Sequence, residues 1–155
     1  MWYCLAMAQA DRASEVLNDV DSHEMAMSLP TKDVVTRLVD ILGLSLVAVI
    51  GGVAETRAVA QWTTGREPQR PQVLRFALQI ALMIAESTDG TMARAWFQGS
   101  NPRLDDRSPA LMLHSMPLEQ IQGQIAAAAR AFAARQIPAP PPPSKSDVSI
   151  ARMRP

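Results

Sequence analysis

Apolar residues recur every three or four positions along much of the chain, which is the spacing of one face of an α-helix. The first clear stripe predicts a helix over 32–42, with Thr31 as its N-terminal cap. A short helix over 46–50, capped by Ser45 and closed by glycines, follows it. No stretch alternates apolar and polar residues as a half-buried strand does, so helices are expected throughout.

Two further helices complete the first half of the pattern. One is predicted over 55–63, and the other begins at Pro71, because proline fits the first turn of a helix, and runs to about residue 86. The inward-facing residues of the shorter helix are expected to be Ala54, Val59 and Trp62.

Residue pairs typical of helix starts divide the second half of the chain. Thr88 or Asp89 is expected to cap a short helix, and Asn101-Pro102 marks a turn. Ser108-Pro109 combines a capping side chain with a proline at the first helical position. A long helix over 117–136 follows, with Leu118, Ile121, Ile125, Ala129 and Phe132 on one face.

These elements predict an all-α fold: a small helical bundle containing a helix-turn-helix, then a subdomain of short helices and a long C-terminal helix. Before the bundle, two basic residues stand against five acidic ones, and a short helix over 9–20 is expected there. Five of the six residues from 138 to 143 are proline, a composition typical of a disordered segment. The expected divisions are an acidic, partly flexible extension over 1–32, a helix-turn-helix domain over 33–87, a second helical domain over 88–137 and a proline-rich disordered tail over 138–155.

Composition narrows the classes of partner. The 155 residues are 48% apolar but only 5% aromatic, and fifteen basic residues balance fifteen acidic ones. A balanced chain has no general attraction for nucleic acid or anionic membranes, so any such site has to be local. Cys4 is the only cysteine, which excludes an internal disulfide and a multi-thiolate metal site. No apolar run reaches the length of a membrane span, and we expect a cytoplasmic protein without a membrane partner.

Two short helices joined by a glycine-containing turn are the layout of a helix-turn-helix, whose second helix presents its N-terminal residues to the bases of DNA. Over 54–75, four arginines stand against two glutamates, a small excess for a DNA surface. The candidate DNA-binding residues are Arg57, Gln61, Thr64, Arg66 and Arg70. The alternative is a helical hairpin used only for packing.

The segment AETRAVAQWTTGREP (54–68) resembles the Xre-type helix-turn-helix of the Xre/MbcA/ParS antitoxin family. The segment ARAWFQGSNPRLDDRSPALML (93–113) resembles the toxin-binding domain of the same family, in which a Trp is followed by Asn-Pro, a Leu, then Pro and a Leu pair. The matching residues here are Trp96, Asn101-Pro102, Leu104, Pro109 and Met112-Leu113. Together the two segments extend the resemblance over about residues 33–136.

The resemblance implies a type II antitoxin that neutralises a RES-domain, NAD-degrading toxin and represses its own operon, acting as a homodimer on operator DNA. The 98–113 loop and the far end of the 117–136 helix are expected to face the toxin. The toxin-binding residues are expected to be Asn101, Arg103, Leu104, Arg107 and Pro109, with Trp62 and Trp96 as structural anchors. The alternative is a stand-alone transcription regulator whose C-terminal half only dimerises.

The sequence departs from the family pattern at the helix-turn-helix. The turn at Gly51-Gly52-Val53 is one residue longer than usual, and Glu55 stands where a Ser or Thr cap is common. A glutamate there repels phosphate, which weakens the case for DNA binding.

Asp105 and Asp106 are the one pair of neighbouring acids that suggests a metal or acid–base site. They are flanked by Arg103 and Arg107, and we expect a solvated loop in which these charges pair with one another.

No other constellation of side chains indicates chemistry. His23 and His114 are the only histidines, and neither has a Cys/His cluster in its neighbourhood. No glycine-rich phosphate loop and no nucleophile elbow is present. We therefore expect no enzymatic activity, no metal and no cofactor.

Overall fold

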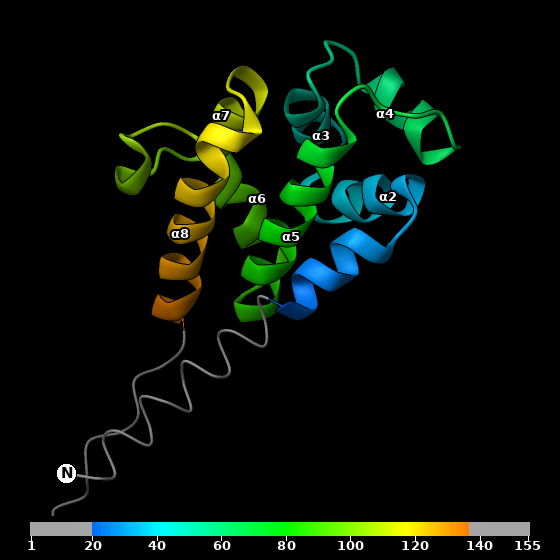
Figure 1. Ribbon diagram of the computed structural model, residues 1–155. Helices are drawn as coiled ribbons and strands as arrows, with labels where there is room; N and C mark the ends of the chain where they lie inside the picture. The colour runs from blue at the N-terminus through cyan, green and yellow to red at the C-terminus, as the bar shows by residue number, and fades with distance from the viewer. Residues whose placement is uncertain (1–19, 137–155) are drawn as a thin grey trace, which may run out of the picture.

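The computed structural model describes residues 20–136, which form helices and contain no β-strand (Figure 1). The predicted all-α fold is confirmed. After a helical segment over 20–28, the elements are α2 (Thr31–Leu42), α3 (Leu44–Gly51), α4 (Thr56–Thr63), α5 (Pro71–Ser87), α6 (Gly90–Gln98), the 3-10 turn η1 (Pro102–Leu104), α7 (Pro109–Ser115) and α8 (Leu118–Gln136).

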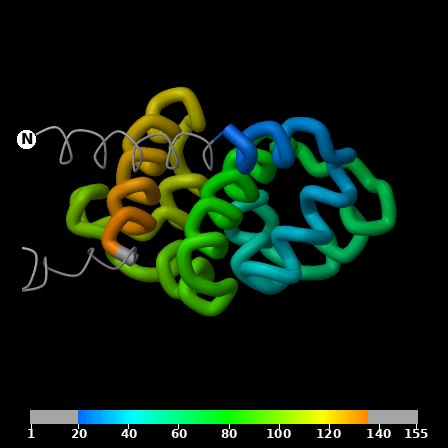
Figure 2. The backbone as a smooth tube through the Cα atoms, turned by 90° about the horizontal axis from the view of Figure 1, so that it is seen from below, coloured from blue at the N-terminus to red at the C-terminus, as the bar shows by residue number. Residues whose placement is uncertain are grey.

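Helix α5 is the centre of the molecule. It packs against α2 on one side and α8 on the other, as the two views in Figures 1 and 2 show. A helix enclosed in this way needs a broad apolar surface, and α5 buries residues on more than one side: Val73, Leu74, Ala77, Leu78, Ile80, Ala81, Met83 and Ile84. One apolar core therefore extends from the first described residues to α8.

The predicted helix starts at Pro71, Asp89 and Ser108 are confirmed. The Asp89 side chain accepts a hydrogen bond from the backbone N–H of Met92, and Ser108 accepts one from Leu111. Pro71 is the first residue of α5, as expected. In each case the start of the helix depends on a residue at or next to its first position, so the start could be predicted without knowledge of any tertiary contact.

Three predictions in the first half are wrong. Thr31 is the first residue of α2 rather than its cap, and its hydroxyl accepts a hydrogen bond from Arg75. Ser45 lies inside α3, because Gly43 adopts a φ of 87° and lets α3 start at once after α2. Ala54 is exposed, since it lies in the turn before α4 instead of in the helix.

The residues before α2 are held more firmly than expected. The Arg75 guanidinium donates hydrogen bonds to the backbone carbonyls of Ala26 and Leu29, at 2.8 and 2.7 Å. Ser22 and Ala26 are buried. The acidic segment up to residue 32 therefore packs on the bundle from residue 20 onward. The predicted helix over 9–20, except for its last residue, and the proline-rich tail lie outside the described residues.

Candidate binding surfaces

Helices α3 and α4 meet at 93° across the four-residue break that separates them. This angle and the short connection match the helix-turn-helix motif. The turn forms at Gly52, whose φ of 76° lies in the left-handed region that glycine adopts without strain. The backbone N–H groups of Gly52 and Val53 then donate hydrogen bonds to the carbonyls of Val49 and Ala48 in the last turn of α3. The turn that the sequence shows to be longer than usual is therefore held to the end of α3 by hydrogen bonds and leads directly into α4.

The outer face of α4 brings together most of the predicted DNA-binding residues. Arg57, Gln61 and Thr64 are four and three residues apart, so they share one side of the helix. Arg57 and Thr64 are exposed, and Gln61 is half-buried. Arg66 folds back over the end of α4, where its Nη1 donates a hydrogen bond of 2.6 Å to Gln61 Oε1. We call these four residues the α4 patch.

Arg70 is oriented differently from the α4 patch. Its Nη1 donates a hydrogen bond of 3.1 Å to the backbone carbonyl of His114 in α7. The His114 ring in turn lies against α3, with Nδ1 2.9 Å from the carbonyl oxygen of Val49. Because a carbonyl only accepts, this contact places the proton on Nδ1. Arg70 and His114 thus join the helix-turn-helix to α7, a role that the sequence did not indicate.

The loop between α6 and α7 closes on itself through Asn101. The Asn101 side chain accepts a hydrogen bond from the N–H of Arg103, and its backbone bonds to both Asp106 and Arg107. Leu104 is 2% exposed and fills the core beneath the loop. Asn101 and Leu104 therefore shape this loop, and Leu104 offers no surface to a partner.

The remaining toxin-binding candidates also include both buried and exposed residues. Pro109 is buried at the start of α7, while Arg103 and Arg107 are exposed. Among residues 20–136 no ion pair joins either arginine to Asp105 or Asp106, so the expected self-paired loop is wrong. Both aspartates have positive φ angles, of 55° and 59°, in a tight turn. Arg107 instead directs Nη1 at the sulfur of Met116, 3.7 Å away.

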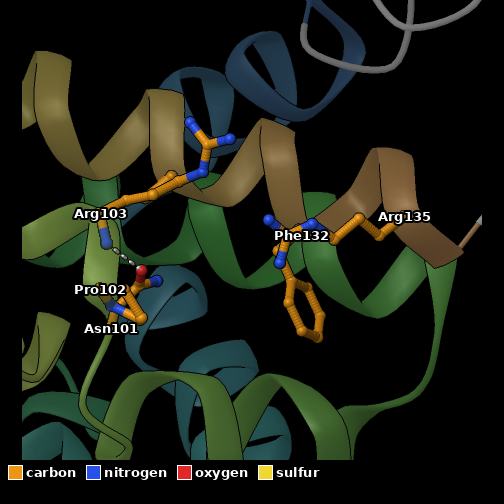
Figure 3. Close-up of a pocket in the computed structure, with 6 residues that line it drawn as sticks. Asn101, Pro102, Arg103, Phe132 and Arg135 are labelled. Atoms are coloured by element: carbon orange, nitrogen blue, oxygen red, sulfur yellow. Dashed lines mark hydrogen bonds between the residues drawn. The ribbon is translucent and has the colours of Figure 1, made fainter.

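A small pocket of about 70 Å³ lies between this loop and α8 (Figure 3). Asn101, Pro102 and Arg103 line one side, and Ala128, Phe132 and Arg135 of α8 line the other. Figure 3 shows the two arginines reaching along the same side of α8. The far end of the long helix contributes to this pocket through Arg135, a residue that the sequence does not single out. Two guanidinium groups beside an aromatic ring can bind a carboxylate or a phosphate.

An open groove of about 440 Å³ runs along the outer side of α7. Its residues are Asp106, Arg107, Ser108, Leu111, Met112, Ser115 and Met116. Leu111 is 59% exposed, the largest exposure among the big apolar side chains described. Sequence reasoning missed this residue because Leu111 lies within the apolar run ALML, in which Ala110, Met112 and Leu113 are buried.

Within the described part of the chain, no group of three or more His, Cys, Asp or Glu side chains could hold a metal ion. No single helix in that part is long and apolar enough to cross a membrane, and α3 and α4 reach such a composition only as a sharply bent pair. Comparison with protein-family models, curated proteins and solved structures finds no match to this chain.

Proposed function

We propose that the protein is an antitoxin that binds and neutralises a RES-domain toxin and represses its own operon. The toxin would be held by the loop over 101–107 together with the end of α8, and operator DNA by the α4 patch of a homodimer. The proposal rests on the resemblance of the two ordered segments, and the geometry of both surfaces supports it.

The observation that carries the toxin-binding part is the pairing of Arg103 and Arg135 across one pocket. These two cations come from different elements, and neither guanidinium group has a hydrogen bond or ion pair among residues 20–136. Guanidinium groups pair with carboxylates in a two-bond geometry, so this surface is suited to acidic residues of the toxin. The loop is closed by the bonds of Asn101, so it loses little conformational entropy on docking.

The DNA-binding part is supported by the helix-turn-helix angle and by the exposed cations of the α4 patch. Arg57 and Arg66 are both exposed, but the acidic Glu55 and Glu67 are exposed beside them. So small a positive excess supports a weak and strongly salt-dependent affinity for a single copy. Two copies on a two-fold symmetric operator would add their contacts.

The toxin-binding part is tested by co-expressing the chain with the toxin of the neighbouring gene and scoring growth and co-purification. The variants Arg103→Glu and Arg135→Glu are each expected to fail to rescue growth and to fail to co-purify with the toxin, because each places a negative charge in the pocket. Lys32→Glu is the matched control, since Lys32 is an exposed cation on α2. Full rescue by the double variant Arg103→Glu/Arg135→Glu would rule out this pocket as the neutralising surface.

Substitutions are preferable to truncation here. A chain that ends before α8 would expose the side of α5 that α8 covers, and loss of rescue would then report unfolding. Thermal unfolding of each charge variant should match that of the wild type.

The alternative is a transcription regulator whose C-terminal half dimerises, and the exposed Leu111 in the α7 groove favours it. This alternative predicts a dimer that Leu111→Glu dissociates, together with promoter binding and no neutralisation of any neighbouring toxin. Analytical ultracentrifugation of the wild type and the variant tests the dimer contact, and the co-expression assay separates the two functions.

A further inference from the structure

We propose that the α4 patch selects guanine over adenine in DNA, and that Arg66 sets this preference by holding the side-chain amide of Gln61. The inference rests on the DNA-binding part of the proposed function and adds the class of base that is read. It follows from which hydrogen-bonding atoms of the patch are already engaged within the protein.

The bond between Arg66 and Gln61 fixes how the amide is turned. Arginine can only donate hydrogen bonds, so the amide atom 2.6 Å from Arg66 Nη1 has to be the oxygen. The backbone holds the pair together as well, because the N–H of Arg66 donates to the backbone carbonyl of Gln61 at 3.1 Å. Thr64 donates its hydroxyl hydrogen to the same carbonyl, at 2.8 Å. The Gln61 NH₂ group remains without a hydrogen-bond partner among residues 20–136.

This arrangement changes which base the glutamine recognises. A free glutamine reads adenine with two bonds, accepting from N6 through its oxygen and donating to N7 through its nitrogen. In the α4 patch Arg66 takes one of the two lone pairs of the oxygen and its guanidinium lies against that atom, so the amide NH₂ and the remaining N–H groups of the guanidinium make up most of the hydrogen-bonding surface. Guanine presents two acceptors in the major groove, O6 and N7, and matches a surface of donors. The N6 amino group of adenine would meet another donor.

Arg57 adds further hydrogen-bond donors to the same face of α4. Its side chain is exposed, has no hydrogen bond or ion pair among the described residues, and offers only donors. It precedes Gln61 by four residues, which is roughly 6 Å along a helix axis and close to two base steps of about 3.4 Å each. Ala60, beside them, is exposed and small, so it does not keep the helix away from the base edges. The preferred site should therefore carry guanines about two steps apart.

The experiment is a selection from a pool of randomised duplexes of about 30 base pairs, long enough for two half-sites one helical turn apart. The full chain is used at low salt as wild type, Arg66→Ala and Gln61→Glu, with Lys32→Ala as the control for loss of an exposed cation away from α4. The wild type and Lys32→Ala should enrich guanine at two positions per half-site. Changing either guanine to adenine should weaken wild-type binding by about tenfold or more.

The two variants show which guanine position is read by Gln61 and which by Arg57. Arg66→Ala frees the Gln61 oxygen, so one guanine position should come to accept adenine while the position read by Arg57 keeps guanine. Gln61→Glu replaces donors by acceptors, and the same position should favour cytosine, whose N4 amino group donates.

Three results would overturn the inference: wild-type enrichment of adenine at the position that Gln61→Glu alters, an unchanged preference in Arg66→Ala, or no enriched base at all. Any of these alongside full rescue in the co-expression assay leaves toxin neutralisation standing. Loss of neutralisation alongside an intact guanine preference would overturn that part of the proposed function and leave the base preference unaffected.

Discussion

The indole ring of Trp62 lies so close to Gly51 that a Cβ atom added to the glycine would come within 2.6 Å of the ring. Trp62 is 5% exposed, and its contact crosses from α4 to the last residue of α3. The glycine therefore allows the two helices of the turn to approach closely. Trp62 therefore fills the junction between α3 and α4 with an apolar ring.

Gly51→Ala is expected to lower the free energy of unfolding by about 1–3 kcal/mol, because the added methyl group overpacks the junction. Gly123→Ala is the matched control. Gly123 lies inside α8 with no atom within 4 Å of a built Cβ, so alanine should stabilise the helix by about 0.5–1 kcal/mol. Urea unfolding of both variants measures the two effects. Equal stability of Gly51→Ala and wild type would contradict the close contact.

The two buried tryptophans should differ in their response to phenylalanine. Trp96 is 8% exposed, and its buried indole N–H finds no acceptor among the described residues. Trp→Ala at either position should cost about 3–5 kcal/mol through the cavity left behind. Trp96→Phe removes a buried donor that lacks a partner, so it should cost roughly 1–2 kcal/mol less than Trp62→Phe. Denaturant unfolding at a single temperature makes the comparison, and equal losses would argue against an unsatisfied N–H.

Arg75→Ala should release the segment before α2 from the bundle. The guanidinium bonds to two backbone carbonyls and to the Thr31 hydroxyl, and hydrogen bonds of this charged kind contribute about 1.5–3 kcal/mol. We expect a loss of about 2–3 kcal/mol and faster amide hydrogen exchange over 20–30. Arg57→Ala removes an exposed arginine without such bonds and should change neither quantity. Unaltered exchange in Arg75→Ala would show that other contacts hold the segment.

Glu86 should make stability depend on pH. Burial of part of its side chain raises the pKa of Glu86 above the ordinary value of 4.5, and the negative charge of Asp21 raises it further. The folded state therefore binds this proton more tightly than the unfolded state does, and stability falls as the pH rises through the folded pKa. Glu86→Gln should melt at a higher temperature than wild type at neutral pH.

The difference between Glu86→Gln and wild type should shrink on acidification and disappear once the carboxyl is protonated in both the folded and the unfolded state. Asp21→Asn should give a smaller gain at neutral pH, because it removes only the second cause. A gain that is independent of pH would contradict the assignment.

The helices and some of their caps could be predicted from the sequence, because apolar spacing and capping side chains act within a few residues. Asp89 and Ser108 are examples, since each bonds to a backbone N–H three residues later. Ser45 was misassigned because the abrupt restart at Gly43 depends on one backbone angle. A capping motif in the sequence does not reveal such an angle.

The candidate surfaces could be predicted only in part. The spacing of Arg57, Gln61 and Thr64 was enough to place them on one face of α4. The bond from Arg70 to His114 joins residues that are 44 positions apart, and no local pattern encodes it. The burial of Leu104 likewise depends on α8 covering the loop, which the family resemblance did not specify.

The enclosure of α5 between α2 and α8 has a consequence for how such a chain can change during evolution. A recombination event after residue 87 would keep α5 but replace the helix that covers it, leaving apolar surface without its complement. The two halves should therefore not be interchangeable with those of other proteins by simple fusion. A change of partner specificity would then be expected to arise by substitutions in exposed residues such as Arg103 and Leu111, with the side of α8 that packs on α5 inherited intact.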